Sequence, residues 1–307
     1  MRKFESPPRA LFFKSPRPND SRVGELVRMV TEATIEGAKP GFVLLGYPDD
    51  EGIRINFGRA GSREAPDAIR AAFYKLTPGR NDFPLLYDLG NLVLDLPLRE
   101  RHEAALETVA LLHKTKHRTI SLGGGHDYAY CDIGGFLEST KKRALVVNID
   151  AHLDVRPDTD GPNSGSAFYR LLEKYKNFDL VEVGIQPFCN SRNHRAYAEK
   201  KKVKIFDLKD AHNQLHKVLA PYLKAKRPTF ISIDIDAFSS AYAPGASASY
   251  ASGFEPNEVM SLIRTMNEKL DVRAIGIYEV SPPLDFQNRT AQFAAILAHT
   301  YLHSIAK

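Results

Sequence analysis

Short apolar runs alternate with longer amphipathic stretches along most of the chain. From residue 41 onward, the short runs are rich in β-branched and aliphatic side chains, as strands are, and the longer stretches repeat apolar residues at helical spacing. A strand followed by a helix, repeated in this way, predicts a parallel sheet with helices on both faces. We expect strands at residues 41–47, 117–126, 143–150, 180–186, 202–208, 229–236 and 272–280, and helices at 65–76, 132–140, 165–176, 214–226, 256–270 and 290–305.

Two of the expected strands belong in the middle of the sheet. The runs at residues 144–149 and 229–235 lack the alternation of apolar and polar residues that a strand with one exposed face shows. Residues 1–38 differ from the rest, because they are rich in proline and charge and then become helix-like from residue 23 to 38. We predict that residues 1–38 form an N-terminal arm packed on the main domain and that residues 39–307 form a single α/β domain.

The composition excludes several classes of protein. Of the 307 residues, 43% are hydrophobic and 26% are charged, as in an ordinary globular protein. No window approaches the run of about 18 apolar residues that a membrane helix needs. Lys14 and Pro16 interrupt the apolar run near the N-terminus, so we expect neither a secretory signal nor a membrane partner.

The number of cysteines bears on the cellular compartment, and the distribution of charge bears on nucleic-acid binding. Cys131 and Cys189 are too few and too far apart to indicate a disulfide framework, which favours a reducing compartment, the cytosol in the simplest case. The net charge is +5, but the basic residues are scattered and form no stripe. We therefore expect a cytoplasmic protein with no nucleic-acid partner.

Acidic and imidazole side chains stand where the expected strands end. His126 follows the run at 119–125, Asp150 ends the run at 145–150, and Glu279 ends the run at 274–279. Asp234 and Asp236 end the run at 230–236. Ligands of open α/β sheets bind outside the carboxyl ends of the strands, so we expect these groups to meet at one edge of the sheet.

The spacing of these side chains indicates metal ligands. Asp150, His152 and Asp154 recur at every second residue, as do Asp234 and Asp236, and this period points side chains to one side of an extended chain. Buried carboxylates in such number repel one another unless cations are bound between them. Oxygen-rich donors with two imidazoles and no thiolate favour Mn²⁺ or a similar ion, and six protein ligands suit two ions better than one. The six expected ligands are His126, Asp150, His152, Asp154, Asp234 and Asp236.

The remaining histidines that we considered give a weaker signal. His212 and His216 have the i, i+4 spacing of a zinc pair, but polar neighbours indicate a solvated helix face. His299 and His303 repeat the spacing with no acidic residue nearby in the sequence. We interpret these four as packing or surface residues, together with His102, His113, His117 and His194.

Several segments that contain these residues resemble those of the ureohydrolases, the superfamily of arginase and agmatinase. The segments are residues 46–59, 65–70, 123–126, 150–154, 232–236 and 279–282. The resemblance implies a three-layer α/β/α sandwich around a mainly parallel eight-stranded sheet. It also implies a dimanganese centre and a homo-oligomer.

The resemblance also implies a role for each residue. One Mn²⁺ would be held by His126, Asp150, Asp154 and Asp234, and the other by Asp150, His152, Asp234 and Asp236, with Asp150 and Asp234 bridging. Glu279 would hold the planar amidine or guanidine carbon of the substrate above a hydroxide shared by the two ions. The alternative for Glu279 is a salt bridge at the rim of the site.

Departures from the pattern favour one branch of the superfamily. Arginases and agmatinases carry a proton-handling histidine shortly after the Asp-Ala-His-x-Asp motif, whereas residues 163–168 contain none. This segment resembles the formimidoylglutamases, as do residues 50–59, 123–126 and 184–187. Asp154 or solvent would then carry the proton, with Ser164 at most an orienting group. Ser166, Ala167 and Asp127 depart even from the formimidoylglutamase pattern, so the substrate is less closely defined than the chemistry.

Arg156 gives a physical reason for the same choice. It lies two residues beyond Asp154, where a fixed cation disfavours doubly positive agmatine and suits a carboxylate. The alternative is a salt bridge to Asp158 or Asp160. Asn190 and Ser191 are further candidates for contacts with the substrate, with loop capping as the alternative.

The sequence therefore predicts a hydrolase that splits N-formimidoyl-L-glutamate, a small anionic amino-acid derivative, into L-glutamate and formamide, a step of histidine degradation. The alternatives are arginase, agmatinase or another guanidino-acid hydrolase. From another class, a metal-binding paralogue without turnover also fits the ligands. Cys189 lies close in sequence to the proposed substrate contacts. Its oxidation would therefore affect the access of substrate to the site.

Overall fold

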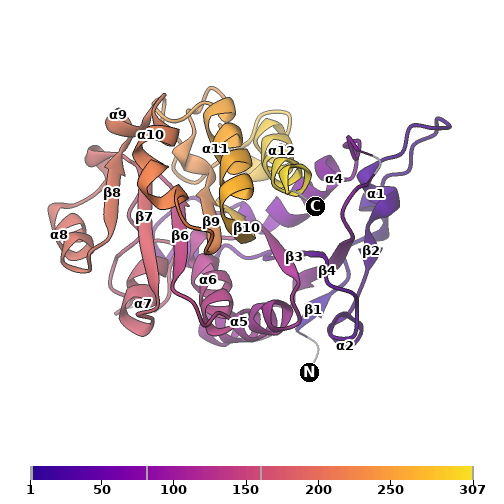
Figure 1. Cartoon of the computed structure of the whole chain (residues 1–307), viewed down its shortest axis with the longest axis horizontal. Helices are drawn as coiled ribbons and strands as arrows, with labels where there is room; N and C mark the ends of the chain where they lie inside the picture. Colours follow the sequence, from indigo (N-terminus) through magenta and orange to yellow (C-terminus); the bar gives the residue numbers. More distant parts are fainter. Residues whose placement is uncertain (1–2, 81, 160, 306–307) are drawn as a thin grey trace.

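One sheet forms the centre of the molecule, and helices pack on both of its faces (Figure 1). The structure, a computed structural model, describes residues 3–80, 82–159 and 161–305. Within these residues the sheet has ten strands in the order β1-β4-β3-β5-β10-β9-β6-β7-β8, and β2 pairs with β4. The strands are β1 (Phe4–Glu5), β2 (Arg28–Met29), β3 (Phe42–Gly46), β4 (Leu86–Leu92), β5 (Arg118–Leu122), β6 (Ala144–Ile149), β7 (Phe178–Ile185), β8 (Lys204–Asp207), β9 (Pro228–Asp234) and β10 (Asp271–Tyr278).

The parallel arrangement confirms the predicted fold class. The strands β3 to β10 form an eight-stranded parallel sheet, with β1 antiparallel and β2 parallel to β4. Every residue of β6 and β9 is buried, and the two strands are neighbours in the middle of the sheet. These two runs without clean alternation thus have the position that the pattern predicted.

Two hydrophobic cores lie on opposite faces of the sheet and make three layers. The helices α4 (Ala65–Phe73), α11 (Pro256–Lys269) and α12 (Arg289–Ser304) contribute to one core. The helices α5 (Leu98–Lys114), α6 (Ala129–Glu138) and α7 (Ala167–Lys174) contribute to the other. Further helices lie at the side of β8 and in the loops: α3 (Glu51–Ile55), α8 (Arg192–Lys200), α9 (Leu208–Ala211) and α10 (Leu215–Leu219). Among the described residues, no helix is both long enough and apolar enough to cross a membrane.

The helix-like pattern at residues 23–38 is only partly helical in the structure. The segment contains α1 (Val23–Leu26), β2 and α2 (Glu32–Ile35). Val27 takes an extended conformation and ends α1, and the N–H of Val30 donates to the carbonyl of Asp88 in β4. The edge of the sheet thus takes the backbone hydrogen bonds that a continuous helix would have made. The boundary at residue 38 between an arm and a main domain stays a prediction.

The helix expected at residues 214–226 is also shorter than predicted. It divides into α10 and a 3₁₀ turn at Ala220–Leu223. Pro221 has no N–H to continue the helical hydrogen bonds, which explains the change at this point. The sequence patterns also missed several elements, of which β4, α5 and α8 are the longest.

Candidate metal centre

Four neighbouring strands bring the expected polar side chains to one edge of the sheet. The strands β5, β10, β9 and β6 are adjacent in this order. His126 follows β5, Glu279 follows β10, Asp234 ends β9 and Asp150 follows β6. Because these strands are parallel, their carboxyl ends lie side by side, as the sequence predicted.

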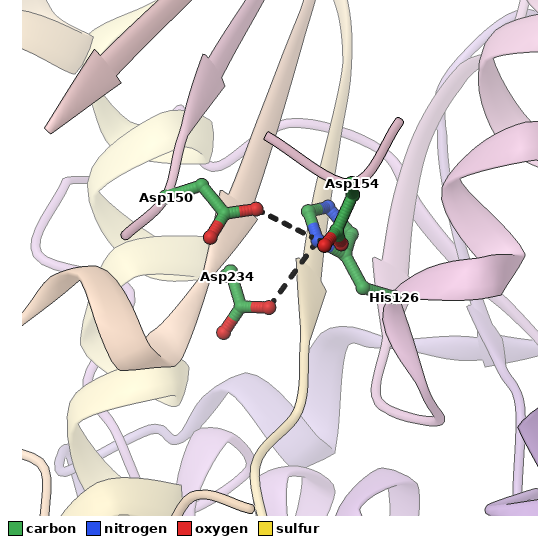
Figure 2. Close-up of side chains that lie close together, drawn as sticks. All are labelled: His126, Asp150, Asp154 and Asp234. Atoms are coloured by element: carbon green, nitrogen blue, oxygen red, sulfur yellow. Dashed lines mark ion pairs between the residues drawn. The ribbon is translucent and has the colours of Figure 1, made fainter. Parts of the chain in front are cut away.

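A first group surrounds one ring nitrogen of His126 (Figure 2). The Nδ1 atom of His126 lies 3.0 Å from Oδ2 of Asp150 and 3.0 Å from Oδ2 of Asp154. An Oδ2 atom of Asp234 lies 3.2 Å from the same nitrogen. One ligand-type atom from each of these four residues lies within 4.8 Å of the others.

His126 itself shows that the group fits a cation. Its Nδ1 atom is buried and, within the described part of the chain, has no hydrogen-bond partner of good geometry. Buried polar atoms without a partner are rare, and this one faces three carboxylate oxygens. A metal ion among them would use the lone pair of the nitrogen and neutralise the carboxylates.

A second group lies next to the first. The Nδ1 atom of His152 is 2.9 Å from Oδ2 of Asp236 and 3.6 Å from Oδ1 of Asp150. The two oxygens of Asp150 therefore face different groups, as a bridging carboxylate requires. Asp234 belongs to the first group, and its Oδ1 atom accepts a hydrogen bond from the N–H of Asp236 at 2.8 Å. A bridging role for Asp234 stays a prediction.

Neighbouring side chains fix the orientation of both imidazoles. The Nε2 atom of His126 lies 2.9 Å from the hydroxyl of Ser232, and Nε2 of His152 lies 3.1 Å from the hydroxyl of Tyr250. In metal sites such contacts to the distal nitrogen set the tautomer and turn the other nitrogen toward the ion. The ring of Tyr278 also stacks on His126, with centroids 5.0 Å apart.

The pKa values show how crowded with charge the centre is without ions. Burial raises the pKa of Asp154, Asp234 and Asp236, and neighbouring carboxylates raise it further. Burial opposes a charge on His126, but the carboxylates of Asp150, Asp154 and Asp234 raise its pKa well above the ordinary value. Metal binding at this centre would therefore compete with protons.

Glu279 stands beside the first group in a strained conformation. Its φ angle is 63°, and that of Asp154 is 46°, both in the left-handed region that side chains with a Cβ rarely adopt. The Oε1 atom of Glu279 accepts a hydrogen bond of 2.9 Å from the backbone N–H of His126. Burial and the charge of Asp234 raise the pKa of Glu279 well above its usual range. Strain of this kind persists where the surrounding structure holds it, and it concentrates at functional sites.

A cavity of about 270 Å³ opens above these groups. Arg156 and Ser164, two of the four predicted substrate contacts, line it. Asn190 and Ser191 are not among the residues that line it. The side chain of Asn190 bonds the backbone of Ala151, Leu153 and Gln186, and Ser191 caps α8. Their geometry favours the alternative of loop capping. The lining residues are Asn56, Phe57, Gly58, Arg59, His152, Asp154, Arg156, Ser164, Asp234, Asp236, Ser247, Ala248 and Glu279.

Arg156 is exposed, and no described acidic residue forms an ion pair with it. Asp158, one of its two expected alternatives, lies 3.5 Å from Arg99 and 3.7 Å from Arg170 instead. Asp160, the other alternative, lies outside the described residues. The guanidinium at the mouth of the cavity is therefore a candidate partner for an anionic ligand.

The sequence patterns missed several residues near the site. Asn56, Phe57 and Arg59 line the cavity, although their segment entered only through the family resemblance. His102, expected to be a packing or surface residue, is buried and lies 2.8 Å from Asp127, the neighbour of His126. No spacing signal points to His102, because α5 carries it to this place from a distant part of the chain.

Comparisons with known proteins agree with this geometry. The family model described as the arginase family matches residues 40–303. A formimidoylglutamase of Staphylococcus carnosus is 33% identical over an alignment of 275 residues, and the match covers 86% of this chain and 87% of that protein.

Solved structures show the same architecture. The formimidoylglutamase of Bacillus subtilis superposes with a TM-score of 0.83 at 25% identity, over 95% of this chain and 93% of that one. A formiminoglutamase of Trypanosoma cruzi, solved with Mn²⁺, has a TM-score of 0.77 at 24% identity over 98% of each chain. These similarities place the strands and helices described above in a known fold.

Proposed function

The chain belongs to the arginase family, and from this premise we propose that it is a dimanganese hydrolase that converts N-formimidoyl-L-glutamate and water into L-glutamate and formamide. The observation that carries the proposal is the pair of ligand groups that share Asp150 below a cavity with Arg156 in its wall. The relatives that carry the name formimidoylglutamase support the choice of substrate.

The metal ligands in this proposal are the six residues expected from the sequence. His126, Asp150, Asp154 and Asp234 would hold one ion, and Asp150, His152, Asp234 and Asp236 the other. A pair of bound Mn²⁺ ions lowers the pKa of a shared water, which supplies a nucleophile near neutral pH. The formiminoglutamase of Trypanosoma cruzi, solved with Mn²⁺, supports this choice of metal.

Glu279 would position the substrate. Its Oε1 atom already accepts the N–H of His126, so its carboxylate is held in one orientation at the cavity wall. A fixed carboxylate can accept hydrogen bonds from the nitrogens of the amidine and hold the planar carbon for attack. It also balances the positive charge that those nitrogens carry.

Arg156 would bind a substrate carboxylate, and Asp154 would carry the proton. Residues 163–168 provide no histidine for proton transfer, whereas Asp154 lines the cavity and is half-buried beside Asp150, whose charge raises its pKa. Ser164 accepts a hydrogen bond of 2.9 Å from the side-chain amide of Asn56, which suits an orienting role. The amine of glutamate would leave once it is protonated.

The proposal also covers the compartment, the pathway and the oligomeric state of the enzyme. Two free cysteines agree with a reducing compartment, and we infer a cytoplasmic enzyme of histidine degradation. We also infer a homo-oligomer, from the family resemblance alone.

A substrate panel tests the function. Protein reconstituted with Mn²⁺ is assayed with formimidoylglutamate, arginine, agmatine and guanidinobutyrate, beside the variants Arg156→Met and Arg156→Lys. We expect formimidoylglutamate to have the highest kcat/KM, because only it offers two carboxylates to Arg156. The Met variant should lose at least about tenfold in kcat/KM for this substrate, since charge-assisted hydrogen bonds contribute about 1.5–3 kcal/mol, and the Lys variant should lose less.

Other outcomes distinguish the alternatives. A preference for agmatine in the unchanged protein would contradict the role of Arg156 and favour another guanidino hydrolase. A full complement of metal with no turnover of any amidine would favour a binding protein without catalysis.

A further inference from the structure

The turn after α3 carries an aromatic side chain where glycine is the usual residue. Phe57 has a φ angle of 60°. Its N–H donates to the carbonyl of Arg54 at 3.0 Å, and the N–H of Gly58 donates to the carbonyl of Ile53 at 2.8 Å. This pair of hydrogen bonds is the Schellman motif, and its left-handed position favours glycine because a Cβ atom is strained there.

Packing within the chain gives no reason for the ring. The side chain of Phe57 is 98% exposed, the highest value among the exposed large hydrophobic residues of the described chain. A phenylalanine normally stabilises a fold by burying its ring, and here almost none of it is buried. Glycine at this position would remove both the strain and the exposed apolar surface. The reason for a phenylalanine therefore lies in something that comes from outside the chain.

The position of the strained residues indicates that the partner of the ring is a ligand of the cavity. Three residues with a side chain and a positive φ angle line the cavity: Phe57, Asp154 and Glu279. The other two belong to the proposed metal centre or hold the substrate beside it. Phe57 thus shares with them both the cavity and the strain that typically marks a functional site.

The backbone on both sides of Phe57 is held in place. The side-chain amide of Asn56 donates to the hydroxyl of Ser164 at 2.9 Å. After it, the N–H of Arg59 donates to the hydroxyl of Ser247 and its guanidinium Nε to the carbonyl of Ser247, each at 2.9 Å. These contacts join the turn to two other loops of the cavity, so the segment that carries the ring is anchored at the wall.

The rest of the cavity wall explains what the ring adds. Apart from Gly58 and Ala248, the other lining residues are polar or charged. Phe57 is the only large apolar side chain among the lining residues that the structure describes. A ligand with charged ends and aliphatic carbons between them needs one apolar surface in such a cavity.

We propose that Phe57 is a specificity-determining residue whose ring covers the aliphatic carbons of the bound substrate. The proposal rests on the proposed function, in which those carbons are the two side-chain methylene groups of N-formimidoyl-L-glutamate. Substrate binding then buries the face of the ring that solvent contacts in the free chain. The strain of the turn is retained because glycine would leave this part of the wall open.

Glycine and asparagine variants separate the ring from the backbone conformation. Phe57→Gly and Phe57→Asn both suit a positive φ angle but remove the ring, whereas Phe57→Tyr keeps it. Lys116→Gly and Lys202→Gly are matched controls, because these lysines have φ angles of 66° and 65°. Both lysines end helices through the same pair of backbone hydrogen bonds, on turns outside the cavity lining.

We expect KM for formimidoylglutamate to rise about tenfold in the Gly and Asn variants, with kcat within about threefold of the unchanged protein. This rise corresponds to about 1.4 kcal/mol, as for a small apolar contact. The Tyr variant and both lysine controls should keep KM within about threefold. The Tm of all three glycine variants should stay the same or rise by a few degrees, because each loses strain.

Each contrary result has its own meaning. If the unchanged protein is active and Phe57→Gly leaves KM unaltered, the inference is wrong and the proposed function stands. A fall in Tm confined to the Phe57 variants would show that the ring stabilises the fold, which overturns the inference. A changed oligomeric mass with unaltered KM would assign the ring to a contact between subunits and overturn it too. An unchanged protein that hydrolyses no amidine overturns the proposed function and this inference together.

Discussion

Glu279 combines three properties that are unfavourable for an ordinary side chain. It is 6% exposed, has a positive φ angle, and lies close enough to Asp234 for that carboxylate to raise its pKa. A rim salt bridge, the alternative expected from the sequence, is not formed within the described residues, since the carboxylate accepts the N–H of His126. A residue with these costs and no cationic partner fits a role in binding a cationic amidine.

The variant Glu279→Gln tests this role at the residue scale. Its amide oxygen can still accept the N–H of His126, so the loop after β5 should keep its conformation. Loss of the negative charge should lower kcat/KM at least about a hundredfold, as the loss of one electrostatic contact to a transition state does. Steady-state kinetics and metal analysis on the same samples measure both effects.

The control for this variant is Glu255→Gln, which changes an exposed glutamate at the start of α11. It should leave the kinetics unaltered. If Glu279→Gln kept kcat/KM within about threefold, or if it lost its metal, Glu279 would not have the role proposed for it.

At the scale of elements, the patterns predicted most strands and missed β4 for a physical reason. Asp88 and Asn91 interrupt its apolar run, and both are buried. Arg70 of α4 makes this possible, because its buried guanidinium bonds Asp88, Asn91 and the carbonyl of Gly90. A pattern within one segment cannot show that a partner from another element satisfies its polar residues.

The short strand β2 follows the same rule, because the edge of β4 replaced helical hydrogen bonds there. The divided helix at residues 215–223 has a local cause, because Pro221 ended a helix that apolar spacing would have continued. Helices with clear spacing and few competing contacts, such as α11 and α12, were predicted within two residues of their observed ends.

His113 joins α5 to β5 and should make folding stability depend on pH. Its Nε2 atom lies 3.3 Å from the hydroxyl of Thr119, and burial, helped by the charge of Arg273, lowers its pKa from 6.5 to about 3. The folded protein therefore keeps this ring neutral, while the unfolded chain takes up a proton below about pH 6.5. Stability from this group is present above pH 6.5 and decreases as the pH falls toward 3.

Protonation of His113 in the unfolded chain should lower the free energy of unfolding by about 2 kcal/mol when the pH falls from 7 to 5. The variant His113→Gln should lack this part of the pH dependence. Urea unfolding of chelator-treated protein at both pH values measures it without metal release. The control is His216→Gln, because His216 is exposed and bonds Ser261. Equal losses in the unchanged protein and in His113→Gln would contradict the buried neutral ring.

At the scale of the whole molecule, the sequence predicted the position of the metal centre but not the wall of the cavity. The ligands follow strand ends, and parallel strands bring their ends together whatever the loops do. The wall depends on loops from residues 56–59, 164 and 247–248, which meet through contacts such as those of Arg59 with Ser247. No periodic pattern records these contacts, so Phe57 and Ser247 were missed and Asn190 was expected in the wall.

The central claim is that two ions bind side by side in the centre, sharing Asp150. Anomalous X-ray diffraction at the manganese absorption edge, from crystals of the Mn²⁺-reconstituted protein, tests it most directly. We predict two anomalous peaks about 3.5–4 Å apart, one among His126, Asp150, Asp154 and Asp234 and the other beside His152 and Asp236. A single peak, or peaks only elsewhere on the molecule, would contradict the account.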